Sequence, residues 1–337
     1  MRKTLPAIRD GINFIATLNA SKLINALCIH FSYVASILLR RPKHCGLPTS
    51  ISIEPTTSCN LRCPECPAGL RKFSRPTGMM PADIFKNAID QLKAKLIWLM
   101  LYFQGEPYLN PAFFEMVQYA AKEKVYTATS TNAHFLTDEN ARKTVESGLH
   151  RLIISIDGTT QETYQQYRIG GKLDQVTEGV ANIVKWKKQL ASTTPYVIVQ
   201  FLVLKSNQHQ IPEIKALAGK LGVDRLDLKT AQVYNYANDN DRIPDDPKYA
   251  RYVKTAEGRW KLKKPLKNHC FRMWSGAVIT WDGTIVPCCF DKDASHKLGS
   301  LDRNNFAKIW KSEAYQSFRT QILNDRSKIE ICRNCTE

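Results

Sequence analysis

The stretch SISIEPTTSCNLRCPEC, residues 50–66, places three cysteines shortly after a short apolar run. The run at 51–53 predicts a β-strand, and Cys59, Cys63 and Cys66 lie in the loop that follows it. Three thiolates within eight residues can bind one metal centre from a single loop. Structural zinc has four ligands, usually in paired C-x2-C knuckles. Three thiolates without an obvious fourth suit an iron–sulfur cluster that leaves one iron open.

Five further apolar runs follow and alternate with helical patterns. The runs span residues 96–103, 125–131, 152–156, 196–204 and 223–228. The helical patterns span residues 81–95, 111–124, 138–148, 174–188 and 210–221, with Asp138 as an expected helix cap and Gly148 as an expected helix stop. Strands that alternate with helices predict a parallel sheet with right-handed crossovers. Six units are too few for a closed eight-stranded barrel, so we expect an α/β fold with a partial (β/α)6 TIM-like barrel.

Three segments are expected on this basis. Residues 1–46 would form an N-terminal helical arm, because apolar positions recur there at helical spacing. Residues 47–240 would form the barrel. Residues 241–337 would form a linker and a small C-terminal domain.

The C-terminal region has its own predicted elements. Residues 231–268 are rich in Asn, Asp, Pro and Lys and predict a linker or lid. Two short runs, 277–280 and 285–287, flank an Asp-Gly step, which is typical of a β-hairpin. A helix is expected at 304–323. The small domain is therefore predicted to contain a hairpin and a helix.

Composition limits the class of protein. Of 337 residues, 43% are hydrophobic and 23% are charged, which excludes a disordered, collagen-like or coiled-coil chain. No run of about 18 uninterrupted apolar residues occurs, so no clear transmembrane helix is expected. The net charge of +17 divides into +6 on residues 1–44, +3 on residues 45–241 and +8 on residues 242–337. The basic flanks could face anionic lipid, nucleic acid or an acidic substrate, or could serve solubility alone.

Eight of the ten cysteines fall into two groups, and only Cys28 and Cys45 stand apart. No secretory leader with a small-residue cleavage site is evident. In a chain that is not exported, closely spaced thiols indicate metal ligands rather than disulfides. We therefore expect a cytoplasmic protein with two metal centres.

The spacing C-x3-C-x2-C resembles the cysteine signature of the radical S-adenosylmethionine (radical SAM) superfamily. The segment Gln104-Gly105-Glu106-Pro107 is similar to the Gly-Gly-Glu-Pro segment that follows the second strand in that family, with Gln104 in place of the first glycine. Because Gly105 lacks a side chain, a ligand can approach the backbone closely there. The resemblance implies that Gly105 and Glu106 lie near the amino group of S-adenosylmethionine (SAM).

The resemblance implies further SAM contacts at the carboxyl ends of the strands, where α/β sheets hold their ligands. Ser130 and Asn132 end the third predicted strand, and Ser155 and Asp157 end the fourth, as candidates for the ribose or methionine end. Arg168 matches an arginine that meets the SAM carboxylate. The family often has an aromatic residue before the last cysteine, where this chain has Glu65, so Glu65 is not assigned a role.

The second cysteine group resembles the SPASM domain, which follows many radical SAM barrels. The pattern runs from Cys270 through Gly283 to Cys288-Cys289 and ends in Cys332-x2-Cys335. A full SPASM domain has seven cysteines and two auxiliary clusters. The second group of this sequence has only five cysteines, as in the shortened twitch-like form. The resemblance implies one auxiliary [4Fe–4S] cluster held by Cys270, Cys288, Cys332 and Cys335, with Cys289 spare or an alternative to Cys288. Four cysteines could also hold structural zinc.

The resemblance implies a radical mechanism. Cys59, Cys63 and Cys66 would hold a [4Fe–4S] cluster that binds SAM, and one-electron reduction would yield a deoxyadenosyl radical that abstracts a hydrogen atom from the substrate. An electron donor such as flavodoxin or ferredoxin is implied. The substrate is not identified, and peptide modification and alcohol or sugar oxidation are both open.

Two alternatives from other classes remain at this stage. One is a zinc-organised binding module without catalysis, which iron and sulfide content would distinguish from a radical SAM enzyme. The other is a nucleic-acid-modifying enzyme that uses the basic flanks. The sequence lacks the regular aromatic and basic interleaving of a nucleic-acid recognition surface.

The N-terminal arm has two open interpretations. The stretch 24–39 is mostly apolar, is interrupted by Asn25, His30, Ser32 and Ser36, and is followed by a basic segment at 40–43. It could lie at a membrane interface with its cations at anionic lipid. It could instead pack on the main domain, which is the favoured interpretation. A peripheral contact with the inner membrane face is therefore one expectation for this segment.

Overall fold

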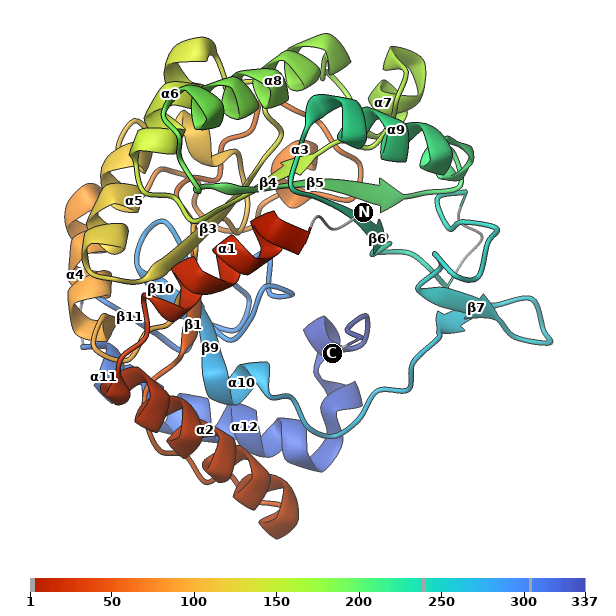
Figure 1. Ribbon diagram of the computed structural model, residues 1–337. Coiled ribbons are helices and arrows are strands. Elements are labelled where there is room, and N and C mark those ends of the chain that lie inside the picture. The colour runs from red at the N-terminus through yellow and green to blue at the C-terminus, as the bar shows by residue number, and fades with distance from the viewer. Residues whose placement is uncertain (1–3, 238–240, 303–304, 337) are drawn as a thin grey trace. The chain divides into compact units, whose positions relative to one another are not determined.

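The structure is a computed structural model that describes residues 4–237, 241–302 and 305–336 (Figure 1). The chain divides into two compact units. The first contains residues 1–12, 59–72 and 129–265, and the second contains residues 13–58, 73–128 and 266–337. The expected N-terminal arm, barrel and C-terminal domain stay predictions, and the boundary residue 240 lies outside the described residues.

The second unit is organised around strand β1 (Ser50–Ile53). Strand β2 (Trp98–Met100) pairs with it in parallel on one side. Strand β9 (Gly276–Ile279) pairs with it in parallel on the other side. The antiparallel strands β10 (Thr284–Val286) and β11 (Gly299–Ser300) continue the sheet beyond β9. The predicted hairpin is therefore part of the same sheet as the strand that leads to the cysteine loop.

Helices surround these strands. The second unit contains α2 (Ala20–Leu39), α4 (Ala82–Leu92), α5 (Phe113–Lys122), α10 (Arg272–Ser275), α11 (Phe306–Trp310) and α12 (Glu313–Asp325). Short 3-10 helices occupy Pro107–Leu109, Arg326–Lys328 and Glu330–Cys332. The single helix expected at 304–323 is wrong in one respect, because Ser312 caps a second helix and divides the segment in two. Residue 304 lies outside the described residues.

Strand β3 (Tyr126–Thr131) pairs with β2 in parallel and passes from the second unit into the first. The first unit then has β4 (Arg151–Ser155), β5 (Tyr196–Val203) and β6 (Arg225–Thr230), all parallel. The strand order β1 to β6 follows the order of the chain. The expected partial TIM-like barrel of six parallel strands is confirmed.

The crossover helices of the first unit are α6 (Asp138–Glu146), α8 (Leu173–Gln189) and α9 (Ile211–Leu221), which lie side by side in Figure 1. The helix cap expected at Asp138 is wrong by one residue. Thr137 is the cap, because its side chain accepts the Asn140 N–H and Asp138 is the first helical residue. Gly148 follows the helix with a φ of 79°, as expected of a stop signal.

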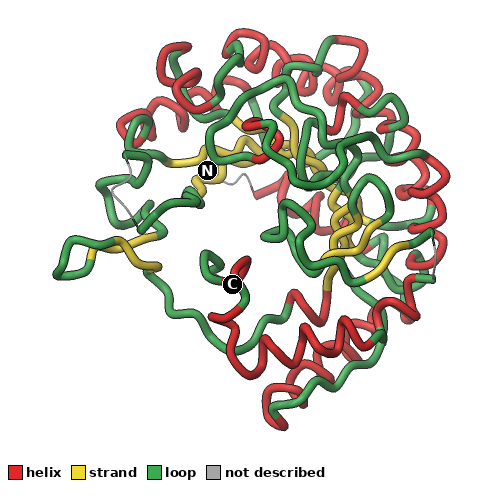
Figure 2. The backbone as a smooth tube through the Cα atoms, turned by 180° about the vertical axis from the view of Figure 1, so that it is seen from behind, coloured by secondary structure: helices red, strands yellow, loops and turns green. Residues whose placement is uncertain are grey.

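Some elements were not expected. Helix α7 (Gln161–Tyr167) and a short α3 (Pro67–Leu70) lie in loops of the first unit, with a 3-10 turn at Gln208–Gln210. The expected linker at 231–268 contains a separate two-stranded sheet, β7 (Tyr252–Lys254) and β8 (Trp260–Leu262), drawn in yellow at the left of Figure 2. The N-terminal arm is two helices, since α1 (Thr4–Ile15) ends before Asn19 caps α2.

Candidate active site and metal centres

The three cysteines of the first group lie on a loop that contains a tight turn closed by a backbone hydrogen bond. The N–H of Cys66 bonds to the carbonyl of Cys63 at 3.3 Å, and α3 starts directly after Cys66. Gly69 in α3 packs on the backbone of Cys63, where an added Cβ would come within 2.5 Å of the amide nitrogen. Because backbone atoms cannot yield to a side chain, this position favours glycine. The loop geometry therefore depends on Gly69 as well as on the cysteines.

Several N–H groups point at the sulfur atoms. Leu61 N–H donates to Sγ of Cys59 at 3.5 Å, and the Asn132 amide approaches the same sulfur at 3.9 Å. Arg168 Nη1 approaches Sγ of Cys63 at 3.9 Å. Cys63 is buried, and burial raises the pKa of its thiol while the charge of Arg168 opposes that shift. Such donors stabilise thiolate sulfur, which is the form that binds metal.

Arg168 is fixed by Asp157. Its Nε donates to Oδ2 of Asp157 at 2.5 Å, and the other carboxylate oxygen accepts the Leu202 N–H at 2.7 Å. Burial works to lower the pKa of Arg168, but Asp157 and Cys63 more than offset it and keep that pKa high. The side chain of Asp157 is thus engaged within the protein. The geometry favours Asp157 as the residue that orients Arg168, and a direct ribose contact by Asp157 stays a prediction.

Asn132 is fixed by a histidine that sequence reasoning missed. His134 Nε2 accepts the Lys172 N–H at 2.8 Å, so the ring proton resides on Nδ1, which faces Asn132 at 3.0 Å. Burial lowers the pKa of His134 and keeps the ring neutral. Asn132 in turn donates to Oδ1 of Asn60 at 2.7 Å. The only sequence signal was the position of His134 two residues after Asn132.

The remaining candidates of the first unit end their strands as expected. Ser130 lies near the end of β3, and Ser155 is the last residue of β4 and is buried. The first unit therefore brings the sulfurs of Cys59 and Cys63 close to Asn132 and Arg168. Contacts of Ser130 and Ser155 with SAM stay predictions.

In the second unit, Gly105 supports the segment that leads to the cysteines. Its φ is 73°, and an added Cβ would come within 2.3 Å of the Thr56 carbonyl oxygen. Glu106 N–H donates to the Ser58 carbonyl at 2.7 Å, directly before Cys59 in the chain. Glu106 is buried, and its carboxylate accepts the Tyr108 N–H at 3.4 Å. Gly105 is thus required for close backbone packing, while contact of this segment with SAM stays a prediction.

Glu65, which had no predicted role, joins the cysteine loop to the segment beyond β6. Its carboxylate accepts the Tyr234 N–H at 2.9 Å and pairs with Arg242 at 3.1 Å. Both partners belong to the stretch expected to be a linker or lid. This stretch is therefore anchored at the cysteine loop by a buried carboxylate.

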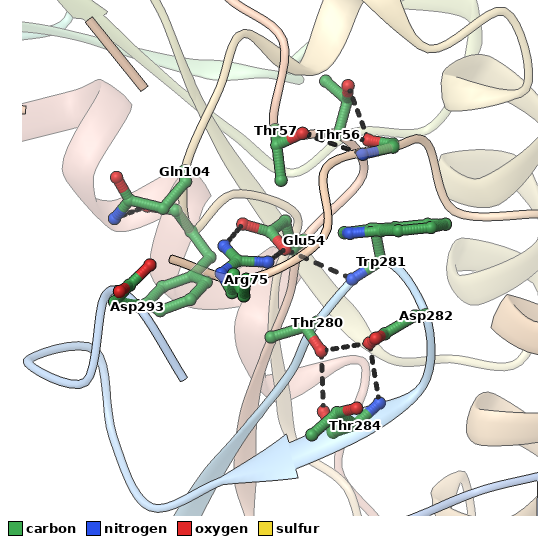
Figure 3. A network of polar contacts seen from close by, with 12 residues as sticks. Glu54, Thr56, Thr57, Arg75, Gln104, Thr280, Trp281, Asp282, Thr284 and Asp293 are labelled. Carbon is green, nitrogen blue, oxygen red and sulfur yellow. Dashed lines mark hydrogen bonds and ion pairs between the residues drawn. The ribbon is translucent and has the colours of Figure 1, made fainter. Parts of the chain in front are cut away.

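A second buried carboxylate lies at the end of β1 (Figure 3). Glu54 binds the Arg75 guanidinium through two hydrogen bonds of 2.6 and 2.8 Å and also accepts the Trp281 N–H at 3.2 Å. In the turn that follows, Asp282 accepts from the Thr280 hydroxyl and from the Thr284 N–H. The network connects the strand before the first cysteine group with the hairpin before Cys288.

The four expected auxiliary ligands surround one small cavity in the second unit. Its lining includes Cys270, Cys288, Cys332 and Cys335. Cys289 does not line that cavity and instead faces a larger one next to it. Burial is the main cause that raises the pKa of the thiols of Cys270, Cys288 and Cys332. The arrangement agrees with the expected ligand set, which stays a prediction.

Arg326 lies among these cysteines and was not foreseen. Its Nη2 donates to Sγ of Cys335 at 3.0 Å, and its Nη1 donates to the His269 carbonyl at 3.0 Å. The side chain is almost fully buried. Burial works to lower the pKa of Arg326, but Cys270, Cys332 and Cys335 raise it overall. A fixed positive charge therefore sits beside the thiols, as expected where thiolates are to be stabilised.

The larger cavity has a volume of about 570 Å³ and lies entirely within the second unit. Alternate residues of two strands line it, namely Ser50 and Ser52 of β1 and Trp98 and Met100 of β2. Cys270, Cys288, Cys289 and Arg272 complete one side. Its size suits a side chain or a small molecule, and a molecule bound there would lie next to the second cysteine group.

Comparisons with known proteins agree with this geometry. Residues 53–199 match the radical SAM superfamily, and residues 270–336 match SPASM, an iron–sulfur cluster-binding domain. A Pyrococcus furiosus protein described as a tungsten-containing aldehyde ferredoxin oxidoreductase cofactor-modifying protein is 30% identical over 312 residues, which are 84% of this chain and 86% of that protein. The chain belongs to the radical SAM superfamily. It is a radical SAM enzyme with a C-terminal SPASM domain.

This radical SAM enzyme is also similar to another curated protein and to several solved structures. A PqqA peptide cyclase of Rhodopseudomonas palustris is 27% identical over 300 residues, covering 81% of this chain and 76% of that protein. Streptococcus suis SuiB bound to S-adenosylmethionine has a TM-score of 0.63 at 14% identity and covers 86% of this chain and 71% of its own. Native anSMEcpe with bound AdoMet has a TM-score of 0.60 at 15% identity, with coverage of 86% and 88%. These two structures support the fold.

The donor sets of this radical SAM enzyme fit iron–sulfur clusters. Each cysteine group presents unbridged thiols with N–H or guanidinium donors at the sulfurs. Within the described ranges, no three His, Cys, Asp or Glu side chains converge on a point suited to a single metal ion. The fit therefore rests on the donors and their spacing along the chain. Catalytic family membership favours an enzyme over the zinc-organised binding module.

Proposed function

We propose that this enzyme cleaves SAM reductively and abstracts a hydrogen atom from a peptide substrate. The observation that carries the proposal is the polar shell of the first cysteine group, in which Asn132 and Arg168 direct N–H groups at Cys59 and Cys63. When bound, the cluster and SAM supply one-electron cleavage to methionine and a deoxyadenosyl radical that takes hydrogen from the substrate. The protein supplies orientation, fixed charge and exclusion of water.

Each residue of the site has a specific part in the proposal. Cys59, Cys63 and Cys66 hold a [4Fe–4S] cluster. Arg168, oriented by Asp157, meets the SAM carboxylate as a permanent cation. The other proposed SAM contacts are Asn132, Ser130 and Ser155 at the ribose or methionine end, and Gly105 and Glu106 at the amino group.

The second cysteine group is proposed to hold one auxiliary [4Fe–4S] cluster through Cys270, Cys288, Cys332 and Cys335. Such a cluster supplies a one-electron acceptor or an anchor for substrate. The neighbouring cavity is the proposed substrate site, because Cys270 and Cys288 line both cavities. Reduced flavodoxin or ferredoxin is the proposed electron donor.

A peptide is the proposed substrate class for two reasons. A relative that matches 81% of this chain is described as a peptide cyclase, and anSMEcpe and SuiB have been solved with a peptide bound. In this chain, the cavity combines apolar Trp98 and Met100 with the hydroxyls of Ser50 and Ser52, which suits an amino-acid side chain and its backbone. Oxidation of an alcohol or sugar is the competing outcome of the test.

The reaction is tested by anaerobic reconstitution with iron and sulfide, followed by mass spectrometry of deoxyadenosine after reduction. Two [4Fe–4S] clusters predict about eight irons per chain. The Cys63→Ala variant should form no deoxyadenosine, because three thiolates are needed to present SAM. The Cys332→Ala variant should retain measurable SAM cleavage with less iron. Stoichiometric zinc without sulfide, or normal cleavage by both variants, would overturn the assignment.

The substrate class is tested separately with the reconstituted enzyme. Pools of synthetic peptides and pools of small alcohols and sugars are each incubated with enzyme, SAM and dithionite. Peptide modification predicts that a peptide pool stimulates deoxyadenosine formation and yields a product about 2 Da lighter, from loss of two hydrogen atoms. Stimulation by the alcohol and sugar pool alone would replace the peptide proposal without affecting the assignment of the clusters.

A further inference from the structure

Helix α2 has its polar side facing inward. The residues of α2 that are buried are Lys22, Asn25, Ile29, Ser32 and Ser36, and four of these five are polar. They follow three- and four-residue steps and therefore form one stripe along the helix. In an ordinary surface helix of a protein in water, the buried stripe is apolar.

The inward polar residues are hydrogen-bonded within the second unit. Asn25 donates to the Leu47 carbonyl at 2.8 Å and accepts the Leu47 N–H at 2.9 Å. Ser36 donates to the Lys43 carbonyl at 2.8 Å and accepts the Trp274 indole N–H at 3.1 Å. Lys22 donates to the Thr17 carbonyl at 2.9 Å and also to the Lys124 carbonyl. These specific bonds fix the rotation of α2, so its outward face is defined.

The outward face of α2 is apolar. Ile24, Leu27, Phe31 and Leu38 are between 57 and 77% exposed, and Val34 is 40% exposed. These residues also follow helical steps and form a continuous stripe along the helix, which lies next to α10 in Figure 1. Exposed apolar stripes of this kind mark an interaction surface.

Cations follow this stripe along the chain, and the stretch that contains it has no acidic residue. Arg40, Arg41 and Lys43 follow α2 directly and are exposed. The sequence between residues 11 and 53 contains no Asp or Glu. A second copy of this surface would bring the same cations without acidic partners, so self-association through it lacks charge complementarity. A partner with an apolar interior and a negatively charged surface layer would complement both the apolar stripe and the cations beside it.

We propose that the outward face of α2 lies in the headgroup boundary of an anionic lipid bilayer. The apolar stripe enters the acyl region to a depth of about 5–10 Å, and Arg40, Arg41 and Lys43 contact anionic headgroups. Such an orientation lets the helix hold the enzyme on a membrane surface while the inward polar bonds keep it attached to the rest of its unit.

The helix is oriented in the membrane plane in this proposal. By length and composition, the 20-residue helix α2 could also cross a membrane. A crossing helix would have to break the bonds of Asn25 and Ser36 and place both polar side chains in hydrocarbon. Those bonds are retained when only the outward face enters lipid.

Co-sedimentation of the full reconstituted enzyme with vesicles tests the proposal. One set contains phosphatidylcholine alone, and the other contains about 30% phosphatidylglycerol. Each Lys or Arg near an anionic surface strengthens binding by about fivefold at low salt, so the three cations predict about 100-fold tighter binding to the anionic vesicles. The Phe31→Ser/Leu38→Ser variant should lose binding to both. The Arg40→Gln/Arg41→Gln variant should lose most of the preference for anionic lipid.

The control variant is Leu190→Ser, which removes an exposed apolar side chain of the first unit and should bind like the unchanged enzyme. Iron content and deoxyadenosine formation confirm that each variant is folded. Absence of binding to anionic vesicles, or unchanged binding of the Phe31→Ser/Leu38→Ser variant, would overturn the proposal. Loss of a dimer in that variant without any lipid binding would also overturn it, in favour of a second copy on this face.

Discussion

Arg75 binds both carboxylate oxygens of Glu54, whose side chain is fully buried while that of Arg75 is 6% exposed. A buried ion pair adds little stability over an apolar replacement, but the loss of one partner leaves an uncompensated buried charge. Arg75→Met should therefore destabilise the enzyme by about 3–5 kcal/mol. The midpoint of urea unfolding under anaerobic conditions measures this loss. The matched control is Lys86→Met, which removes the exposed ion pair to Glu115 and should cost about 0–1 kcal/mol.

The loss in the Arg75→Met variant should depend on pH. Burial raises the pKa of Glu54, and Arg75 opposes that shift in the unchanged enzyme. Without Arg75, the folded variant takes up a proton at a higher pH than its unfolded chain does. Stability then falls as pH rises through that raised pKa, so the deficit should be larger at neutral pH than at acidic pH. A deficit that is equal at both values would contradict an unpaired Glu54 carboxylate as its cause.

The six parallel strands could be predicted from the sequence because a strand that is buried on both faces is a continuous apolar run. Strand β5, for example, is almost continuously buried along Tyr196–Val203, as parallel strands covered on both faces are. An apolar run of this kind predicts a strand from local sequence alone, without knowledge of the strand with which it pairs. The strand order then follows from short connections between consecutive units.

Pairings between distant segments could not be predicted in the same way. The hairpin was expected from its Asp-Gly turn, but its parallel pairing with β1 joins residues more than 200 positions apart. The hydrophobic pattern of β9 is equally suited to a sheet of its own. The β7–β8 hairpin was missed because its strands have only three residues each, one of them an exposed lysine, and lie in a segment rich in Asn, Asp, Pro and Lys.

The site residues that belong to a sequence motif could be predicted. The single residues that hold the motif in place could not. The cysteines follow from their spacing, whereas Arg326, Glu54 and His134 have no local pattern around them. Their roles follow from what they touch in the folded chain. Helix α2 shows the same limit, because its apolar content was visible in the sequence and the direction that each face points was not.

Arg326 should tune the auxiliary cluster. Its guanidinium donates to Cys335 and carries a buried positive charge, which favours the more negative, reduced state of a cluster bound there. Arg326→Gln should lower the reduction potential of the auxiliary cluster by on the order of 50 mV. Arg326→Lys, which keeps the charge, should shift it less. Redox titration followed by electron paramagnetic resonance measures both, and equal shifts in the two variants would argue for a loss of packing alone.

Asp157 should act on SAM through Arg168. Asp157→Asn keeps the shape of the side chain but weakens the charged hydrogen bond to Arg168 Nε. If the poorer orientation of Arg168 costs about 1.4 kcal/mol of binding free energy, SAM should bind about tenfold more weakly. The first cysteine group should retain its four irons. The change in the cluster's paramagnetic resonance spectrum on titration with SAM measures the affinity. Unchanged affinity in this variant would indicate that Arg168 keeps its place without Asp157.

The adjacent Cys288 and Cys289 should behave differently when each is replaced. Cys288 lines the cavity that it shares with Cys270, Cys332 and Cys335, whereas Cys289 faces the larger cavity and lies 3.7 Å from Arg272 Nη1. Cys288→Ala should therefore remove the auxiliary cluster and reduce iron content from about eight to about four per chain. Cys289→Ala should retain the iron and both paramagnetic signals. Because both variants remove one thiol from neighbouring positions, each serves as the control for the other. Iron loss in Cys289→Ala with retention in Cys288→Ala would reverse the ligand assignment and make Cys289 the fourth auxiliary ligand.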